Sequence, residues 1–103
     1  MKRGEIWRVR LLPVPGHTQA GLRPAVLVQE DQATLSLPTV LIVPFTGTQV
    51  ALRFPGTLAV QPDGQNGLTV PSVALVFQLT AIDKTNCLQL LGSLGPATWF
   101  ARD

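Results

Sequence analysis

Short apolar segments separated by turns run along most of the chain. Within residues 6–11, apolar side chains at 7, 9 and 11 alternate with arginines at 8 and 10, and this period of two predicts a half-buried β-strand. The segments 25–28, 40–43 and 73–77 are continuously apolar and rich in β-branched residues. Such runs are typical of strands buried on both faces. A further strand is expected at 58–60.

Proline and glycine punctuate these segments and predict where the strands end. We expect loops at 30–37 and 48–56, and a single helical turn within 83–91. A last short helix is expected to begin at Gly95-Pro96, with proline at its first position. Short strands, frequent turns and few helices indicate a mainly β fold, either a small antiparallel barrel or a sandwich.

The length of 103 residues predicts one domain that spans residues 1–103. Hydrophobic residues make up 46% of the chain and charged residues only 14%. A small monomer has a large surface to cover, so this shortage of charge predicts a buried interface and a homodimer. The longest uncharged stretch, 32–52, is interrupted by prolines, glycine and polar residues, and we expect no membrane span.

Several kinds of chemistry are excluded by residue counts. Cys87 is the only cysteine and His17 the only histidine, so one chain forms neither a disulfide nor a Cys/His zinc site. We therefore expect no metal and no cofactor. The lone cysteine favours a reducing compartment and a cytoplasmic location. No G-x-S-x-G motif is present, which argues against a serine hydrolase.

The charges are distributed unevenly. Residues 1–23 carry five basic side chains and one acidic one, whereas residues 24–103 carry three basic and five acidic side chains. The basic amino-terminal part is suited to contact with a phosphate backbone. Charge alone equally describes a solvated strand face, and it leaves both interpretations open.

Specific residues narrow the choice. Five segments follow one another in a characteristic order. They are the opening at 2–7, the loop and strand at 16–28 with its Arg23-Pro24 pair, the strand end Val43-Pro44-Phe45-Thr46, and the segments at 72–84 and 91–94. Together these segments resemble the MazF/PemK family of toxins from bacterial toxin–antitoxin pairs.

The resemblance implies both a fold and an activity. The fold is an SH3-like small β-barrel of five to six strands, with one or two short helices, that forms a homodimer. The activity is metal-independent, sequence-specific cleavage of single-stranded RNA, often messenger RNA, through attack of the ribose 2′-OH on the adjacent phosphorus. The implied partner is a small antitoxin whose acidic tail covers the RNA groove.

The resemblance also assigns site residues. Arg23 and Thr46 correspond to the catalytic Arg and Thr of the family, and His17 corresponds to its loop histidine. We expect RNA contacts from His17, together with Gln19, Arg53 and Gln78. A guanidinium offers paired donors to phosphate oxygens and stays charged, which suits Arg23. The hydroxyl of Thr46 adds one donor, although it equally suits a turn hydroxyl that bonds its own backbone.

Three positions depart from the family pattern. Thr18 and Phe77 stand where acidic residues are usual, and Thr80 stands where an arginine is usual. We expect Phe77 to lie in the core together with Trp7. Two alternatives therefore stay open. One is a toxin of the same fold that binds antitoxin or RNA without cleaving, and the other is a poison of DNA gyrase, as in the CcdB family.

Overall fold

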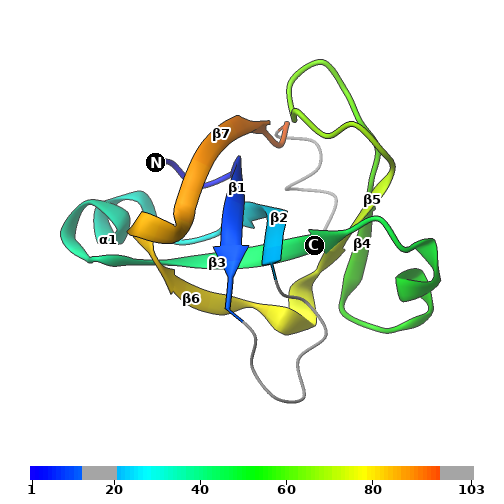
Figure 1. Ribbon diagram of the computed structural model, residues 1–103, viewed down its shortest axis with the longest axis horizontal. Coiled ribbons are helices and arrows are strands. Elements are labelled where there is room, and N and C mark those ends of the chain that lie inside the picture. The colour runs from blue at the N-terminus through cyan, green and yellow to red at the C-terminus, as the bar shows by residue number, and fades with distance from the viewer. Residues whose placement is uncertain (13–20, 96–103) are drawn as a thin grey trace.

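The computed structural model describes residues 1–12 and 21–95, which form short strands, one α-helix and three 3₁₀ turns (Figure 1). The mainly β fold predicted from the sequence is therefore confirmed. In chain order the elements are β1 (Glu5–Leu11), β2 (Gly21–Leu27), α1 (Asp31–Ser36), β3 (Thr39–Thr46), η1 (Gln49–Arg53), β4 (Thr57–Val60), β5 (Ser72–Leu75), η2 (Val76–Gln78), β6 (Thr80–Asp83), η3 (Lys84–Asn86) and β7 (Cys87–Ser93).

All strand pairs are antiparallel, and β3 is the centre of the sheet. The strands follow the order β4-β5-β3-β2-β1-β7, with β6 also paired to β3. One edge of β3 pairs with β2. Along the other edge, residues 39–42 pair with β6 and residues 45–46 pair with β5. Because β3 changes partner along its length, the sheet divides into two halves that diverge around it (Figure 1).

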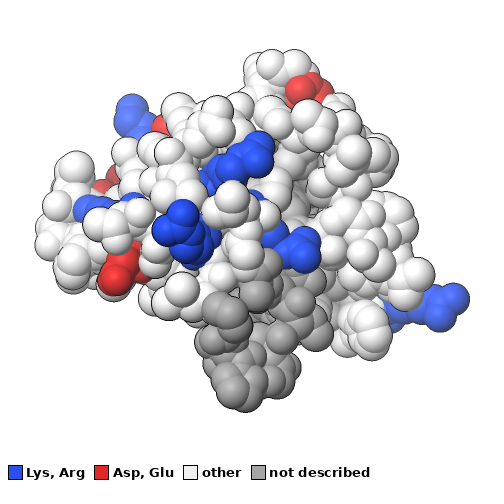
Figure 2. All heavy atoms as spheres, in the orientation of Figure 1, with Lys and Arg blue, Asp and Glu red and all other residues white. Residues whose placement is uncertain are grey.

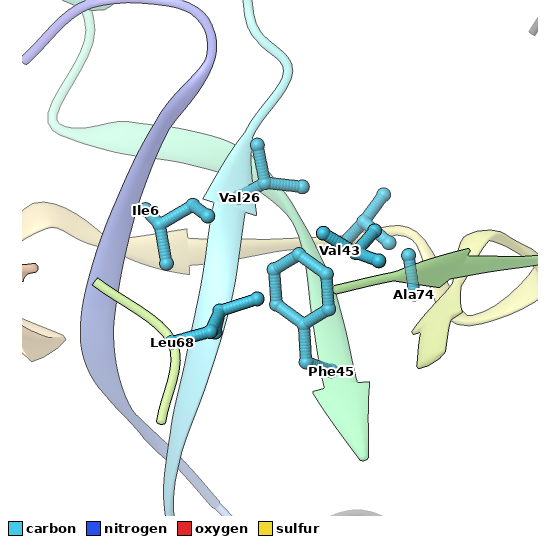
Figure 3. Close-up of a cluster of buried hydrophobic side chains, with 7 residues drawn as sticks. Ile6, Val26, Val43, Phe45, Leu68 and Ala74 are labelled. Carbon is cyan, nitrogen blue, oxygen red and sulfur yellow. The ribbon is translucent and has the colours of Figure 1, made fainter. Parts of the chain in front are cut away.

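Two hydrophobic cores lie on opposite faces of β1, β2 and β3. Side chains alternate between the faces of a strand, so neighbours such as Val26 and Leu27 point to different cores. This explains why the apolar runs in β2 and β3 are continuous, as the sequence predicted for strands buried on both faces. The first core contains Ile6, Val26, Val43, Phe45, Val60, Leu68 and Ala74, and the second contains Val9, Leu11, Ala25, Leu27, Val40 and Ile42 (Figure 3).

The segment between β4 and β5 covers the first core. Leu68 inserts into that core beside Phe45 (Figure 3). The turn before it is held by Asn66, whose side chain is 1% exposed and donates to the Gln61 carbonyl at 2.8 Å. The Asn66 side-chain oxygen accepts the Leu68 backbone N–H at 2.9 Å. These bonds fix the shape of the turn, so that Leu68 reaches the core.

Two local predictions need correction. The expected loop at 30–37 is helix α1, because the Glu30 carboxylate caps it and accepts the N–H groups of Gln32 and Ala33. The expected loop at 48–56 contains the 3₁₀ turn η1. The single helical turn expected within 83–91 is confirmed as η3, and the chain from Cys87 onward is strand β7, paired with β1.

The structure also corrects the expected core. Phe77 lies in η2 and is 56% exposed, because the chain turns out of β5 before reaching it. Trp7 is half-buried, and its indole N–H donates to the Glu5 carboxylate at 3.0 Å. The predicted last helix falls on residues 96–103, outside the described residues.

Candidate functional site

Two prolines mark the place where β2 and β3 separate. Pro24 is in β2, and Pro44 is in β3. Proline has no N–H to give to a strand ladder, so a ladder ends readily beside it. The last β2–β3 pair is Ala25 with Pro44. Beyond this pair, Arg23 and Thr46 belong to strands that no longer bond to each other.

The register of β2 and β3 brings Arg23 and Thr46 to the same end of the two strands. Continued two residues past the pair of Ala25 and Pro44, the register sets Arg23 opposite Thr46. Both residues also share a face with that pair, because side chains alternate along a strand. Residues that are 23 positions apart in the sequence thus lie at the same end of two neighbouring strands.

Thr46 is held firmly. It is 7% exposed and pairs with Val73 of β5. Its hydroxyl oxygen accepts the backbone N–H of Thr48 at 3.3 Å, as expected for a turn hydroxyl. That bond uses the oxygen as an acceptor, so the hydroxyl hydrogen is still available to donate. Gly47, which follows, is exposed and leaves the backbone open.

Arg23 is half-exposed and lies opposite Val9 of β1. The other basic side chains of these two strands are Arg8 and Arg10, both exposed. Figure 2 shows Lys and Arg side chains spread over the middle of the face on which Figure 1 shows β1 and β2. The acidic side chains visible there lie nearer its periphery. We call this surface, over β1 and β2, the basic face.

A cleft of about 310 Å³ opens between the end of β1 and β6. It reaches Pro44, which precedes Thr46 by two residues on the same face, about 7 Å along the strand. Apolar side chains from three strands form part of its lining, namely Leu11, Pro44 and Ile82. Its polar lining consists of Arg10, Thr39, Gln78, Thr80, Asp83 and Asn86.

The predicted RNA-contacting residues are not all together. Gln78 lines the cleft. Arg53 is exposed at the end of η1, the green coil beyond β4 and β5 in Figure 1, and is not part of the cleft lining. His17 and Gln19 lie outside the described residues, as does Thr18.

Sequence reasoning missed the polar residues that line the cleft from other strands. Arg10 comes from β1, Asp83 from the end of β6 and Asn86 from η3. No local motif links them. Only the alternation of β1 carried a signal, and it marked Arg10 merely as a solvent-facing position.

Other chemistry receives little support from the described residues. Burial raises the pKa of the Cys87 thiol, which disfavours the reactive thiolate. Within 1–12 and 21–95, no three His, Cys, Asp or Glu side chains gather to hold a metal ion. No helix in these ranges has the length and apolarity needed to cross a membrane.

Known proteins are similar to this chain in sequence and in fold. The family model described as PemK-like, MazF-like toxin of type II toxin–antitoxin system matches residues 2–100. The endoribonuclease MazF of Staphylococcus saprophyticus subsp. saprophyticus is 31% identical over 91 residues, which cover 88% of this chain and 75% of that protein.

Solved structures agree with the fold. MazF from Deinococcus radiodurans has a TM-score of 0.77 at 19% identity, covering 95% of this chain and 84% of that one. A mycobacterial endoribonuclease in complex with its cognate antitoxin has a TM-score of 0.70 at 21% identity, covering 97% and 82%. The sequence match over almost the whole chain establishes the relationship: this chain belongs to the PemK/MazF-like family of toxins, the endoribonuclease toxins of type II toxin–antitoxin systems.

Proposed function

We propose that this chain is a toxin that cleaves single-stranded RNA, messenger RNA included, in a sequence-specific and metal-independent manner. The ribose 2′-OH attacks the adjacent phosphorus and expels the 5′-oxygen of the next nucleotide. The observation that carries the proposal is the register of β2 and β3, which sets Arg23 and Thr46 at one end and on one face of neighbouring strands.

Arg23 and Thr46 act on the charge that develops during this attack. Negative charge grows on the non-bridging oxygens of the phosphate, and the planar guanidinium of Arg23 donates to two of them while staying charged. Thr46 donates its hydroxyl hydrogen, since its oxygen is oriented by the Thr48 N–H. Preorganised donors of this kind are each worth about 10²–10³ in rate in other enzymes.

RNA is held around this pair by residues from several segments. Gln78 contacts it from the cleft, and His17 and Gln19 contact it from the loop between β1 and β2. Arg53, which is not part of the cleft lining, contacts the RNA farther from the cleaved bond. The basic face over β1 and β2 supplies the sequence-independent attraction for the phosphate backbone (Figure 2).

Two protein partners complete the proposal. A second copy of the chain forms a homodimer, which the many exposed apolar side chains of the described residues support. A cognate acidic antitoxin binds the basic face and blocks RNA. This role is consistent with the related mycobacterial endoribonuclease found with its antitoxin. We propose a cytoplasmic location for the toxin, because messenger RNA and a cognate antitoxin would both be met there.

A toxin that binds RNA or antitoxin without cleaving is the second candidate. Thr80 lines the cleft and Phe77 is exposed next to Gln78, so an apolar and a neutral side chain occupy positions where charges are usual in the family. This candidate predicts RNA binding of ordinary salt dependence with no strand cleavage.

The proposed reaction is tested with the purified protein and single-stranded RNA in excess EDTA. We expect products with a 2′,3′-cyclic phosphate and a 5′-hydroxyl, identified by mass spectrometry. The same oligonucleotides with 2′-O-methyl groups throughout are the control and stay intact, because the attacking hydroxyl is blocked. A requirement for added Mg²⁺ contradicts the mechanism. Binding of intact RNA without cleavage supports the second candidate.

A further inference from the structure

The cleft holds an acidic group that the proposed cleavage does not use. Asp83 lines it, at the junction of β6 and η3, and is exposed. Its side chain makes no capping hydrogen bond to η3. A carboxylate repels phosphate, so this part of the cleft does not suit the RNA backbone. Its chemistry suits a ligand that donates hydrogen bonds.

The lysine that follows Asp83 in the sequence does not occupy this carboxylate. Lys84 follows Asp83 directly, but its ammonium group donates to the backbone carbonyl of Thr34 in α1. The lysine therefore points to the helix. Asn86, one turn later, lines the cleft and offers an amide N–H₂ beside the carboxylate.

The remaining lining suits a flat ring. Leu12, exposed just beyond the end of β1, and the half-buried Ile82 of β6 present apolar surface, and the volume of about 310 Å³ is ample for one nucleobase. Single-stranded RNA is recognised in this way, with an unstacked base laid on an apolar or aromatic surface and hydrogen-bonded along its edge.

We infer that the cleft between β1 and β6 is a base-recognition pocket in which Asp83 selects guanine and disfavours uracil. This inference rests on the proposed function, because it assigns the pocket to one base of the RNA that the toxin binds. Guanine presents two adjacent donors, N1–H and N2–H₂, which match the two oxygens of a carboxylate. The Asn86 amide, which lines the cleft three residues after Asp83, donates to its O6.

Uracil fits the same groups poorly. Its single N3–H is flanked by two carbonyl oxygens, and these face the carboxylate with like partial charge. The position of the pocket gives it a defined place on the RNA. Asp83 pairs with Thr39, about 23 Å along β3 from Thr46, so the recognised base lies several nucleotides away from the phosphate that Arg23 and Thr46 contact.

The test measures binding, so that it does not depend on cleavage. Uncleavable 2′-O-methyl uridine heptamers, each with one guanosine placed at a different position, compete against a fluorescent heptamer in an anisotropy assay. We expect one position at which guanosine binds about tenfold more tightly than uridine, the size expected of a bidentate base contact. In Asp83→Asn the preference falls below about twofold, because an amide presents one donor and one acceptor.

Two further variants isolate the cause. Asp31→Asn removes the same charge at the start of α1, where the amide oxygen still accepts the Arg3 backbone N–H, and we expect it to keep the guanosine preference. Asp83→Glu keeps both carboxylate oxygens and retains part of it. Circular dichroism verifies that each variant is folded.

The outcomes separate the two proposals. A guanosine preference that is absent at every position, or unchanged in Asp83→Asn, overturns the base pocket. If the preference behaves as expected while unmodified RNA stays intact, the pocket stands and the cleavage proposal fails. If RNA is cleaved but the base preference ignores Asp83, cleavage stands and the pocket is wrong.

Discussion

Arg23 and Thr46 differ in what they offer to a phosphate. The guanidinium is planar, always charged and half-exposed, so it neutralises and orients at the same time. The threonine hydroxyl is neutral, 7% exposed and already fixed by the Thr48 N–H. Loss of the arginine therefore removes charge and two donors, whereas loss of the threonine removes one neutral donor.

Arg23→Ala is expected to lower the rate of RNA cleavage by at least about 10²–10³-fold, because both donors and the charge are lost. Arg23→Lys restores little, since an ammonium lacks the planar fork. Thr46→Ala has a milder effect. The measurement is single-turnover cleavage of a labelled single-stranded RNA in EDTA.

Arg8→Ala is the matched control. Arg8 lies on the neighbouring strand β1 but on the opposite face of the sheet, since Arg23 shares its face with Val9. The control loses the same charge, so it weakens binding in a salt-dependent way and leaves the cleavage step unchanged. Equal rates for Arg23→Ala and wild type are the result that rejects the catalytic role of Arg23.

Among the elements, the loop between β4 and β5 depends on close backbone contact with β7. Gly67 has a φ of +72°, a conformation that side chains rarely adopt. A Cβ at this position would overlap the backbone carbonyl of Leu91. Across the same contact, the N–H of Ser93 donates to the carbonyl of Gln65 at 2.9 Å. The loop thus holds Leu68 in the first core by lying directly on β7.

Gly67→Ala is expected to destabilise the protein by at least about 2 kcal/mol, from the positive φ and the overlap with backbone. Urea unfolding at one fixed protein concentration measures the change. Gly64→Ala is the control in the same loop, because Gly64 has open space around its Cβ position and is not among the glycines with positive φ. It stays within about 0.5 kcal/mol of wild type. Similar stability of the two variants contradicts the packing described.

Across the whole molecule, the described residues leave much apolar surface uncovered. Val50 and Phe54 near η1 and Phe77 in η2 are each more than half exposed. Two of these regions adjoin, since the Phe77 N–H donates to the Gly56 carbonyl at 3.3 Å. Leu88 and Leu90 add further exposure on the edge strand β7. With few charges in the chain, this surface favours association.

We expect a homodimer of twice the chain mass of 11.1 kDa in sedimentation equilibrium at micromolar concentration. The apolar surface just described is the physical reason. Dilution into the nanomolar range is the control, since a true equilibrium shifts toward monomer by mass action. A single 11 kDa species at micromolar concentration contradicts the prediction.

The sequence by itself determined the class of fold and the buried strands. Period-two alternation in β1 and continuous β-branched runs in β2 and β3 depend only on which faces of a strand meet water. A short stretch of sequence is therefore enough to show them. The residues around Arg23 and Thr46 also carried the family relationship. Helix α1 was missed because its cap is a glutamate, Glu30, in a polar segment with no apolar period.

The tertiary structure decided everything that depends on register. The placement of Arg23 and Thr46 on one face, at one end of β2 and β3, follows from the pairing of Ala25 with Pro44, and a shift of one residue would separate their faces. The cleft that joins Arg10 to Asp83 needs β1 and β6 on either side of β3, a relation that no local pattern contains. Phe77 is exposed because the chain turns out of β5 before this residue. Its apolar side chain favours burial, but only the path of the chain decides whether the side chain is buried.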